Sequence, residues 1–433
     1  MCGIVGYVGE QQAAGVLVEG LKKLEYRGYD SAGIAIHHAG EFVTVKTKGR
    51  LKDLEEKIKQ VGTPEGTCGI GHTRWATHGE PSDIIAVLEK DSVTVYTTDG
   101  ETVERETLTA DWDVEAAEKD GYPHFMLKEI FEQTKALNDT ISPRLKDFLV
   151  DFSNEKIPDS LFENTNKIHI VACGTAMHAG MIGKNIIETL ARVDVDVQIA
   201  SEFRYCNPIF HENDLMMVIS QSGETADTLA ALRLAKQQGI TTLAVVNVVG
   251  SSIAREADYV IYTWAGPEIA VASTKAYTVQ LGVMYLLAIK FALAKGKIDL
   301  DSAKKMGKTL LTMPSQMQKI LEKTDDCKYY ASRFQNAANM FFIGRGLDYA
   351  ISLEGSLKLK VVTRGAKVLL IVKEGLPVDM GVARYVLSIP NAEDIYMPLL
   401  SVIPLQLFAY YTAVLRGCDV DQPRNLAKSV TVE

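Results

Sequence analysis

Residues 215–225, LMMVISQSGET, join an apolar run to a polar turn. The first five residues are all apolar, which is typical of a strand buried on both faces, and a helical pattern follows the polar turn. The turn combines three hydroxyls, an amide and a glycine in Ser220, Gln221, Ser222, Gly223 and Thr225. Such a turn at the start of a helix predicts an anion site, most naturally for a phosphate. A simple helix cap is the alternative, but a cap needs only one hydroxyl.

Similar strand, turn and helix units lie on either side of this stretch. Apolar runs at residues 168–172, 242–246 and 259–262 predict further buried strands that alternate with helices. This alternation predicts a parallel, doubly wound α/β sheet. Two more polar candidates, Thr175 and Ser273, occupy turns that are expected to meet the first turn at the carboxyl ends of the strands.

The same unit recurs once in the chain. The run MFFIGRG, residues 340–346, is expected to be a strand that opens a helix, just as the strand before Gly174 does. We therefore predict a second α/β domain of the same kind, starting near residue 338.

Composition divides the chain into four parts. Residues 1–115 alternate short β-branched runs with glycines and predict a β-rich domain with helices at 12–24 and 51–61. Residues 116–165 are polar and predict a helical linker. The two α/β domains are expected at 166–325 and 326–433.

The overall composition excludes several classes of function. A net charge of −9 without a lysine or arginine cluster argues against a nucleic-acid partner. Six cysteines without a CxxC spacing indicate reduced cytoplasmic thiols rather than disulfides or a metal site. The apolar runs at 279–294 and 398–415 are short or interrupted by polar residues and prolines, so buried helices are expected rather than membrane spans.

The chain begins MCGIVG, which places Cys2 one methionine excision from the N-terminus. A terminal cysteine carries a thiol and an α-amine that titrates near pH ~8, so a single residue can supply nucleophile and base. The alternative is a buried cysteine at the start of a strand, because free cysteine is often buried.

Two further segments carry candidate site residues. The stretch GIGHTRWATHG, residues 69–79, concentrates groups suited to holding a carboxylate and excluding water, in Arg74, Trp75, Thr77 and His78. Near the C-terminus, Lys428 stands among apolar neighbours, where a desolvated amine can form a Schiff base. From these residues alone, a surface lysine is the better interpretation of Lys428.

Together these segments resemble the glutamine–fructose-6-phosphate aminotransferase (isomerising) family. The resemblance covers nearly the whole chain and rests on MCGIVG (1–6), LEYRGYDSAG (24–33), HTRWATHG (72–79), SQSGET (220–225) and DQPRNLAKSVTVE (421–433). It implies an N-terminal-nucleophile-type α+β glutaminase domain, followed by two tandem sugar isomerase domains. It also implies a cytoplasmic homodimer that makes glucosamine 6-phosphate from glutamine and fructose 6-phosphate, with no metal or organic cofactor.

The resemblance implies a role for each candidate residue. Cys2 matches the nucleophile that attacks glutamine, and Lys428 matches the Schiff-base lysine for the open-chain ketose. Trp75 matches a gate on the ammonia path. The glutamine-holding positions are Arg74, Thr77 and His78, and the sugar-phosphate cradle is Thr175, Ser220, Gln221, Ser222 and Thr225 with Ser273 nearby. Glu354 and Lys358 match acid–base and positioning groups.

The sequence departs from the family pattern at two junctions. No Asn-Gly pair, the source of the oxyanion hole, occurs in the chain, and the pattern jumps after Asp83. A second jump follows Lys360, where Val361 stands in place of an expected glutamate base; the ring-opening histidine expected beyond it is absent, since the last histidine is His211. Both domains are therefore expected to be incomplete.

Three explanations of these jumps remain open. The 433 residues join segments of a longer enzyme, or the segments were deliberately deleted, or the chain is a short relative that lost activity. We favour the first, because a domain without core strands exposes apolar surface and folds poorly. The alternative function is a sugar-phosphate-binding regulator without turnover, and a stand-alone isomerase ranks last because it leaves Cys2 without a purpose.

Overall fold

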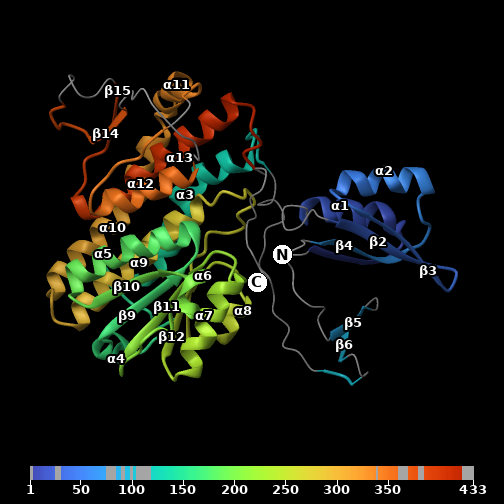
Figure 1. The fold of residues 1–433 in the computed structure, drawn as a ribbon, viewed down its shortest axis with the longest axis horizontal. Helices are drawn as coiled ribbons and strands as arrows, with labels where there is room; N and C mark the ends of the chain where they lie inside the picture. The colour runs from blue at the N-terminus through green and yellow to red at the C-terminus, as the bar shows by residue number, and fades with distance from the viewer. Residues whose placement is uncertain are drawn as a thin grey trace. The chain divides into compact units, whose positions relative to one another are not determined.

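The structure is a computed structural model that describes residues 3–24, 31–74, 84–88, 93–97, 101–103, 119–337, 340–358, 369–378 and 385–421. The chain divides into two compact units, formed by the described residues of Met1–Asp113 and of Val114–Leu426. Each unit is described separately below (Figure 1).

The first unit is built around a four-stranded antiparallel sheet of order β1-β4-β2-β3. Its strands are β1 (Gly3–Val8), β2 (Ser31–His38), β3 (Glu41–Lys48) and β4 (Cys68–Arg74), and a separate hairpin pairs β5 (Ile84–Leu88) with β6 (Val93–Thr97). Helices α1 (Ala13–Leu24) and α2 (Leu51–Val61) confirm the expected helices. They pack Leu17, Leu21 and Leu54 against one face of the sheet.

The other face of this sheet carries exposed apolar side chains. Ile4, Ile70 and Phe42 are 63%, 46% and 71% exposed. The strand registers place these three residues on one face, because Ile4 pairs with His72 while Ile70 pairs with Gly6 and Ala35. In the described residues, this face of the sheet thus carries exposed apolar side chains on three of its strands.

The second unit contains the parallel sheet that the sequence predicts, of order β10-β9-β11-β12-β13. Its strands are β9 (Lys167–Ala172), β10 (Asp194–Ile199), β11 (Asp214–Ser220), β12 (Thr241–Val246) and β13 (Tyr259–Tyr262). Four of the five correspond to the predicted apolar runs. The edge strand β10 was not predicted, although Val195 and Val197 alternate with polar residues in the way a half-buried strand does.

Helices cover both faces of this sheet (Figure 1). Helices α5 (Gly174–Ala191) and α9 (Lys275–Ala294) pack on one face against Ile170 and Met217, while α6 (Ala200–Phe203), α7 (Ala226–Gln237) and α8 (Ser252–Glu256) pack on the other. Because both faces are buried, the central strands are apolar at most positions, which explains their signal in the sequence.

The segment after residue 119 contributes to the same core. Helix α3 (Phe125–Ile141) buries Ile130 and Leu137 in the main hydrophobic cluster. Between α3 and β9 the chain forms a 3-10 turn (Ser142–Arg144), the short strands β7 (Leu145–Lys146) and β8 (Leu149–Val150), and helix α4 (Asp159–Asn164).

Two helices of the described residues are long and apolar enough to cross a membrane by length and composition. One is α9, and 89% of its apolar window is buried inside the unit. The other spans Asp394–Leu415, which joins a 3-10 turn (Asp394–Tyr396) to α13 (Met397–Leu415), and 67% of its window is buried. These fractions are those of core helices, as the sequence predicts.

The C-terminal part of the second unit is mostly helical. Its helices are α10 (Leu300–Leu321), α11 (Thr324–Phe334), α12 (Leu347–Lys358) and α13. A further 3-10 turn, Arg204–Cys206, lies earlier in the chain, between α6 and β11. Strands β14 (Leu369–Lys373) and β15 (Tyr385–Ile389) form a two-stranded parallel pair.

The prediction of a strand over residues 340–346 is wrong. Residues 340–344 have no regular structure, and Phe341 and Ile343 are 74% and 89% exposed. A strand is stable only when a neighbour accepts and donates its hydrogen bonds, and the described residues offer this segment none. Helix α12 nevertheless follows it, so the helical half of the predicted repeat is present.

Candidate functional site: a hydroxyl-lined turn and a buried carboxylate

The predicted anion turn lies where β11 ends and α7 begins. Ser220 is the last residue of β11, and Thr225 is the residue that precedes α7. The hydroxyls of Ser220 and Thr225 are 3.2 Å apart, and the Gly223 amide donates to Ser220 Oγ at 3.0 Å. The Glu224 amide donates to Ser222 Oγ at 3.2 Å. The turn therefore folds into a compact loop of hydroxyls and amides.

Gly223 makes this loop possible. Its φ of +64° lies in the left-handed region, which favours glycine. A Cβ at this position would lie 2.0 Å from Ser251 Oγ and 2.5 Å from Ser251 Cβ. The Gly223 carbonyl also accepts from the Ile253 amide at 3.0 Å, so the turn is fastened to the start of α8.

Thr175 lies at the neighbouring turn, as predicted. Strands β9 and β11 are adjacent and parallel, with Ala172 opposite Ile219, so both turns leave the same edge of the sheet. Gly174, with φ of +54°, starts α5 directly after β9. This edge, at the carboxyl ends of the strands, is where open α/β sheets bind ligands.

The loop that carries Ser273 is held by a buried carboxylate that sequence reasoning missed. Glu268 is buried, and its Oε1 accepts from the amides of Thr274 at 2.7 Å and Ala276 at 3.0 Å. Its Oε2 accepts from Ser273 Oγ at 3.0 Å. Glu268 thus caps the N-terminus of α9 and fixes the direction of the Ser273 hydroxyl.

Replacing Glu268 with alanine is expected to lower the free energy of unfolding by about 2–4 kcal/mol, because two buried amides lose their acceptor. Glu268→Gln is the matched control, since its amide oxygen can still accept from both amides and its Nε2 can donate to Ser273 Oγ. Urea unfolding followed by circular dichroism measures both. Equal losses in the two variants would contradict this account of the cap.

A second buried carboxylate, Glu354, lies beside the Thr175 turn. It comes from α12 and is fully buried. Thr175 Oγ1 donates to Glu354 Oε1 at 3.3 Å, and His178 Nδ1 lies 2.8 Å from Glu354 Oε2. Burial raises the pKa of the Tyr277 phenol well above its ordinary value, and the nearby charge of Glu354 raises it further. Sequence reasoning missed His178, because its contact with Glu354 joins residues 176 positions apart.

The chain before the C-terminal tail is anchored near the same site. The Asp421 carboxylate accepts from the amides of Phe125 at 3.0 Å and Met126 at 2.9 Å, at the start of α3. The Asp421 carbonyl accepts from the Val271 amide at 3.0 Å. The last described residue of the chain is thereby joined to the loop that carries Ser273.

The other predicted site residues are described in part or not at all. Arg74 ends β4 opposite Ser31, and Lys358 ends α12 one helical turn after Glu354. Cys2, Trp75, Thr77, His78 and Lys428 lie outside the described residues, as do the junctions after Asp83 and Lys360.

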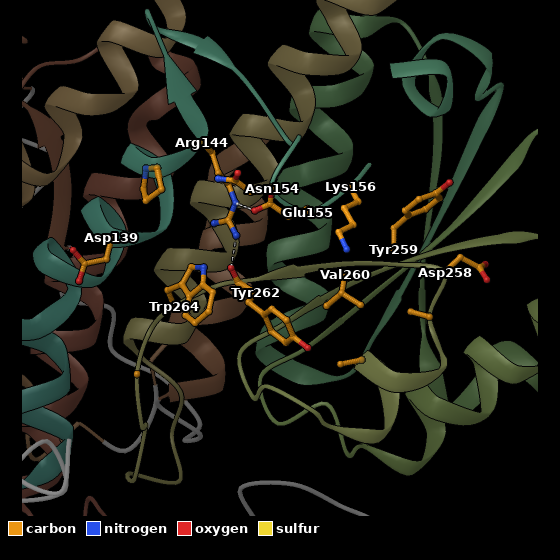
Figure 2. A pocket seen from close by; sticks show the side chains of 14 residues that line it. Asp139, Arg144, Asn154, Glu155, Lys156, Asp258, Tyr259, Val260, Tyr262 and Trp264 are labelled. Atoms are coloured by element: carbon orange, nitrogen blue, oxygen red, sulfur yellow. Dashed lines mark hydrogen bonds and ion pairs between the residues drawn. The ribbon is translucent and has the colours of Figure 1, made fainter. Parts of the chain in front are cut away.

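A pocket of about 1090 Å³ lies elsewhere in the second unit (Figure 2). Figure 2 shows Arg144 reaching Glu155, at 2.6 Å, and the Tyr262 carbonyl, at 2.7 Å. None of the predicted cradle residues lines it. The buried guanidinium of Arg144 is already paired with the Glu155 carboxylate. It therefore adds nothing to the chemistry of the cradle at the end of β11. In the described part of the chain, no group of three metal-ligating side chains is found.

A parallel sheet with a hydroxyl-lined turn at its carboxyl edge is the architecture of a sugar-phosphate isomerase domain, and residues 161–290 match the SIS domain family. The C-terminal domain of glucosamine-fructose-6-phosphate aminotransferase from Francisella tularensis is similar in structure, with a TM-score of 0.68 and 34% identity over 70% of this chain and all of that chain. A putative tagatose-6-phosphate ketose/aldose isomerase from Clostridium novyi shares the fold, with a TM-score of 0.59 and 15% identity over 71% of this chain and 94% of that one.

Curated relatives extend the similarity to the whole chain. The glutamine–fructose-6-phosphate aminotransferases (isomerising) of Clostridium tetani and Thermus thermophilus are 40% and 33% identical, and each comparison covers 100% of both chains. The chain belongs to this family.

The length of the comparison with the Clostridium tetani relative is relevant to the two departures from the family pattern, after Asp83 and after Lys360. The alignment with the Clostridium tetani relative runs over 611 positions, whereas this chain has 433 residues, so 178 positions have no residue of this chain. Because the alignment reaches both ends of both chains, these positions are internal.

Proposed function

We propose that the chain is a glutamine-dependent amidotransferase that makes glucosamine 6-phosphate and glutamate from fructose 6-phosphate and glutamine, a step of amino-sugar (hexosamine) synthesis. The observation that carries the proposal is the loop of Ser220, Ser222 and Thr225 at the carboxyl edge of the sheet, in a chain whose relatives match it from end to end. This loop offers several hydroxyls to a sugar phosphate, and Thr175 stands at the adjacent turn.

We assign the first half-reaction to the N-terminal unit. The α-amine of Cys2 takes the thiol proton, the thiolate attacks the carboxamide carbon of glutamine, and a C–S bond forms. The C–N bond breaks as that proton passes to the leaving nitrogen, which departs as ammonia. Water then hydrolyses the γ-glutamyl thioester to glutamate. Arg74, Thr77 and His78 hold glutamine, and Trp75 gates the path of ammonia.

We assign the second half-reaction to the second unit. The cradle of Thr175, Ser220, Gln221, Ser222 and Thr225, with Ser273 nearby, binds the phosphate. Lys428 condenses with the C2 carbonyl of the open-chain ketose and releases water as an imine forms. Ammonia then displaces the lysine amine from C2, and a proton moves from C1 to C2, which gives glucosamine 6-phosphate. Glu354 and Lys358, one turn apart on α12, serve acid–base and positioning roles. We propose no metal or organic cofactor, and a cytoplasmic homodimer as the assembly.

The first experiment tests turnover. The purified chain is incubated with fructose 6-phosphate and either glutamine or ammonium, and glucosamine 6-phosphate is measured by mass spectrometry. Product in both reactions is expected. Absence of product with ammonium would overturn the assignment of the second half-reaction, whereas absence with glutamine alone would overturn only the first.

A second candidate function is a sugar-phosphate-binding regulator without turnover. The observation that favours it is the sequence itself, which contains no Asn-Gly pair and has Val361 where the family pattern expects a glutamate. In that case fructose 6-phosphate should bind, as measured by calorimetry, while neither nitrogen donor yields product.

A test that alkylates Cys2 with a glutamine-like electrophile requires the reaction rates of the other cysteines to be known. Burial, with a smaller contribution from Asp326, raises the pKa of the Cys327 thiol to about 12, whereas Cys206 and Cys418 are exposed. Because the thiolate is the reactive form, iodoacetamide at pH 8 should label Cys206 and Cys418 well before Cys327. Peptide mass spectrometry measures the three rates. Rapid labelling of Cys327 in the folded protein would show that it is not buried.

A further inference from the structure

The pair formed by His178 and Glu354 is buried and joins the two halves of the second unit. His178 lies on α5, directly after the Thr175 turn, whereas Glu354 lies on α12, in the segment after residue 340. Both side chains are buried, and the 2.8 Å contact runs between His178 Nδ1 and Glu354 Oε2. With the carboxylate ionised, its oxygens can only accept hydrogen bonds, and Nδ1 would carry the proton and donate.

The other carboxylate oxygen faces the cradle. Thr175 Oγ1 donates to Glu354 Oε1, so the two oxygens of one carboxylate are bonded to residues three positions apart on α5. Residues three apart on a helix lie on the same face. Donors at both oxygens fix the plane of the carboxylate as well as its position.

We propose that His178 is a positioning residue that holds the Glu354 carboxylate at the sugar-phosphate cradle. The inference rests on the proposed function of Glu354. A buried carboxylate that loses a donor either turns toward another partner or takes up a proton, and both changes remove it from its working geometry. Because the reacting groups must align closely, such a displacement lowers the rate more than it lowers substrate affinity.

The test compares His178→Ala with His178→Asn. The asparagine amide can place a donor near the position of Nδ1, whereas alanine removes it. In ammonia-dependent synthesis, His178→Ala is expected to lower kcat about 10- to 100-fold with little change in the KM for fructose 6-phosphate. His178→Asn should restore most of the lost kcat. In a Glu354→Gln background, His178→Ala should cause little further loss, because the histidine acts through that carboxylate.

A matched control is available in the same sheet. His169 is also buried, and its Nε2 lies 3.0 Å from Asp214 Oδ2. This pair lies toward the amino ends of β9 and β11, away from the cradle at their carboxyl ends. His169→Ala should lower the unfolding temperature, as His178→Ala also should, but leave kcat unchanged.

The outcomes separate the inference from the proposed function. Wild-type protein that makes no product overturns the proposed function and, with it, the role of the pair. Active wild-type protein with an unchanged kcat in His178→Ala overturns the inference alone, as does an equal loss of kcat in the His178→Ala and His178→Asn variants. Additive losses in the double variant would show that His178 does not act through Glu354.

Discussion

Replacing Cys2 with alanine is expected to abolish glutamine-dependent synthesis of glucosamine 6-phosphate, by more than about 10³-fold, because the reaction loses its nucleophile. Synthesis from ammonium should persist, since free ammonia does not need the thioester. The measurement is product formation with each nitrogen donor at equal concentrations of fructose 6-phosphate. The ratio of the two rates, rather than either rate alone, reports the role of Cys2.

The control for this experiment is Cys206→Ala. Cys206 is an exposed cysteine of the second unit, so its removal should change neither rate. Glutamine-dependent synthesis that survives Cys2→Ala would refute the assignment of the nucleophile. Wild-type synthesis from glutamine is itself expected to be slow, because the chain lacks the Asn-Gly pair and the loss of one oxyanion donor costs about 10²–10³ in rate.

Replacing Gly223 with alanine is expected to weaken fructose 6-phosphate binding by about 10- to 100-fold, since a hydrogen bond to a charged group contributes about 1.5–3 kcal/mol. Two effects combine at this position. The φ of +64° costs an L-residue about 1–2 kcal/mol. In addition, the new Cβ would lie 2.5 Å from Ser251 Cβ, a contact that rotation of the Ser251 hydroxyl cannot relieve. The turn must therefore move, and with it the Ser220 and Ser222 hydroxyls.

Gly239→Ala separates these two effects. Gly239 follows α7 with a φ of +75°, and no atom lies within 4 Å of the position of its Cβ. This variant should show the conformational cost in urea unfolding and bind fructose 6-phosphate normally by calorimetry. If Gly223→Ala bound the sugar as tightly as Gly239→Ala does, the turn would not be the phosphate cradle.

The sequence predicted elements whose pattern is set locally. The strand β11 and the helix α2 were both predicted, because a run buried on both faces is apolar throughout and an amphipathic helix shows its period. Residues 340–344 show the limit of this reasoning. An apolar run becomes a strand only when neighbours pair with it, and the sequence pattern does not say whether those neighbours are present.

For the site, the amino-acid pattern was enough to predict which polar groups lie at the turns. Ser220 ends β11, Thr225 lies in the turn after it, and Thr175 lies in the turn after β9. A parallel sheet brings these turns to one edge. Two other contacts came from the packing of the chain: Glu354 meets His178, and Glu268 accepts a hydrogen bond from Ser273. These carboxylates are buried, and a buried charge must find its donors wherever the packing of distant helices provides them. Contacts such as the one across 176 positions depend on how α12 packs on α5, which no local pattern of residues encodes.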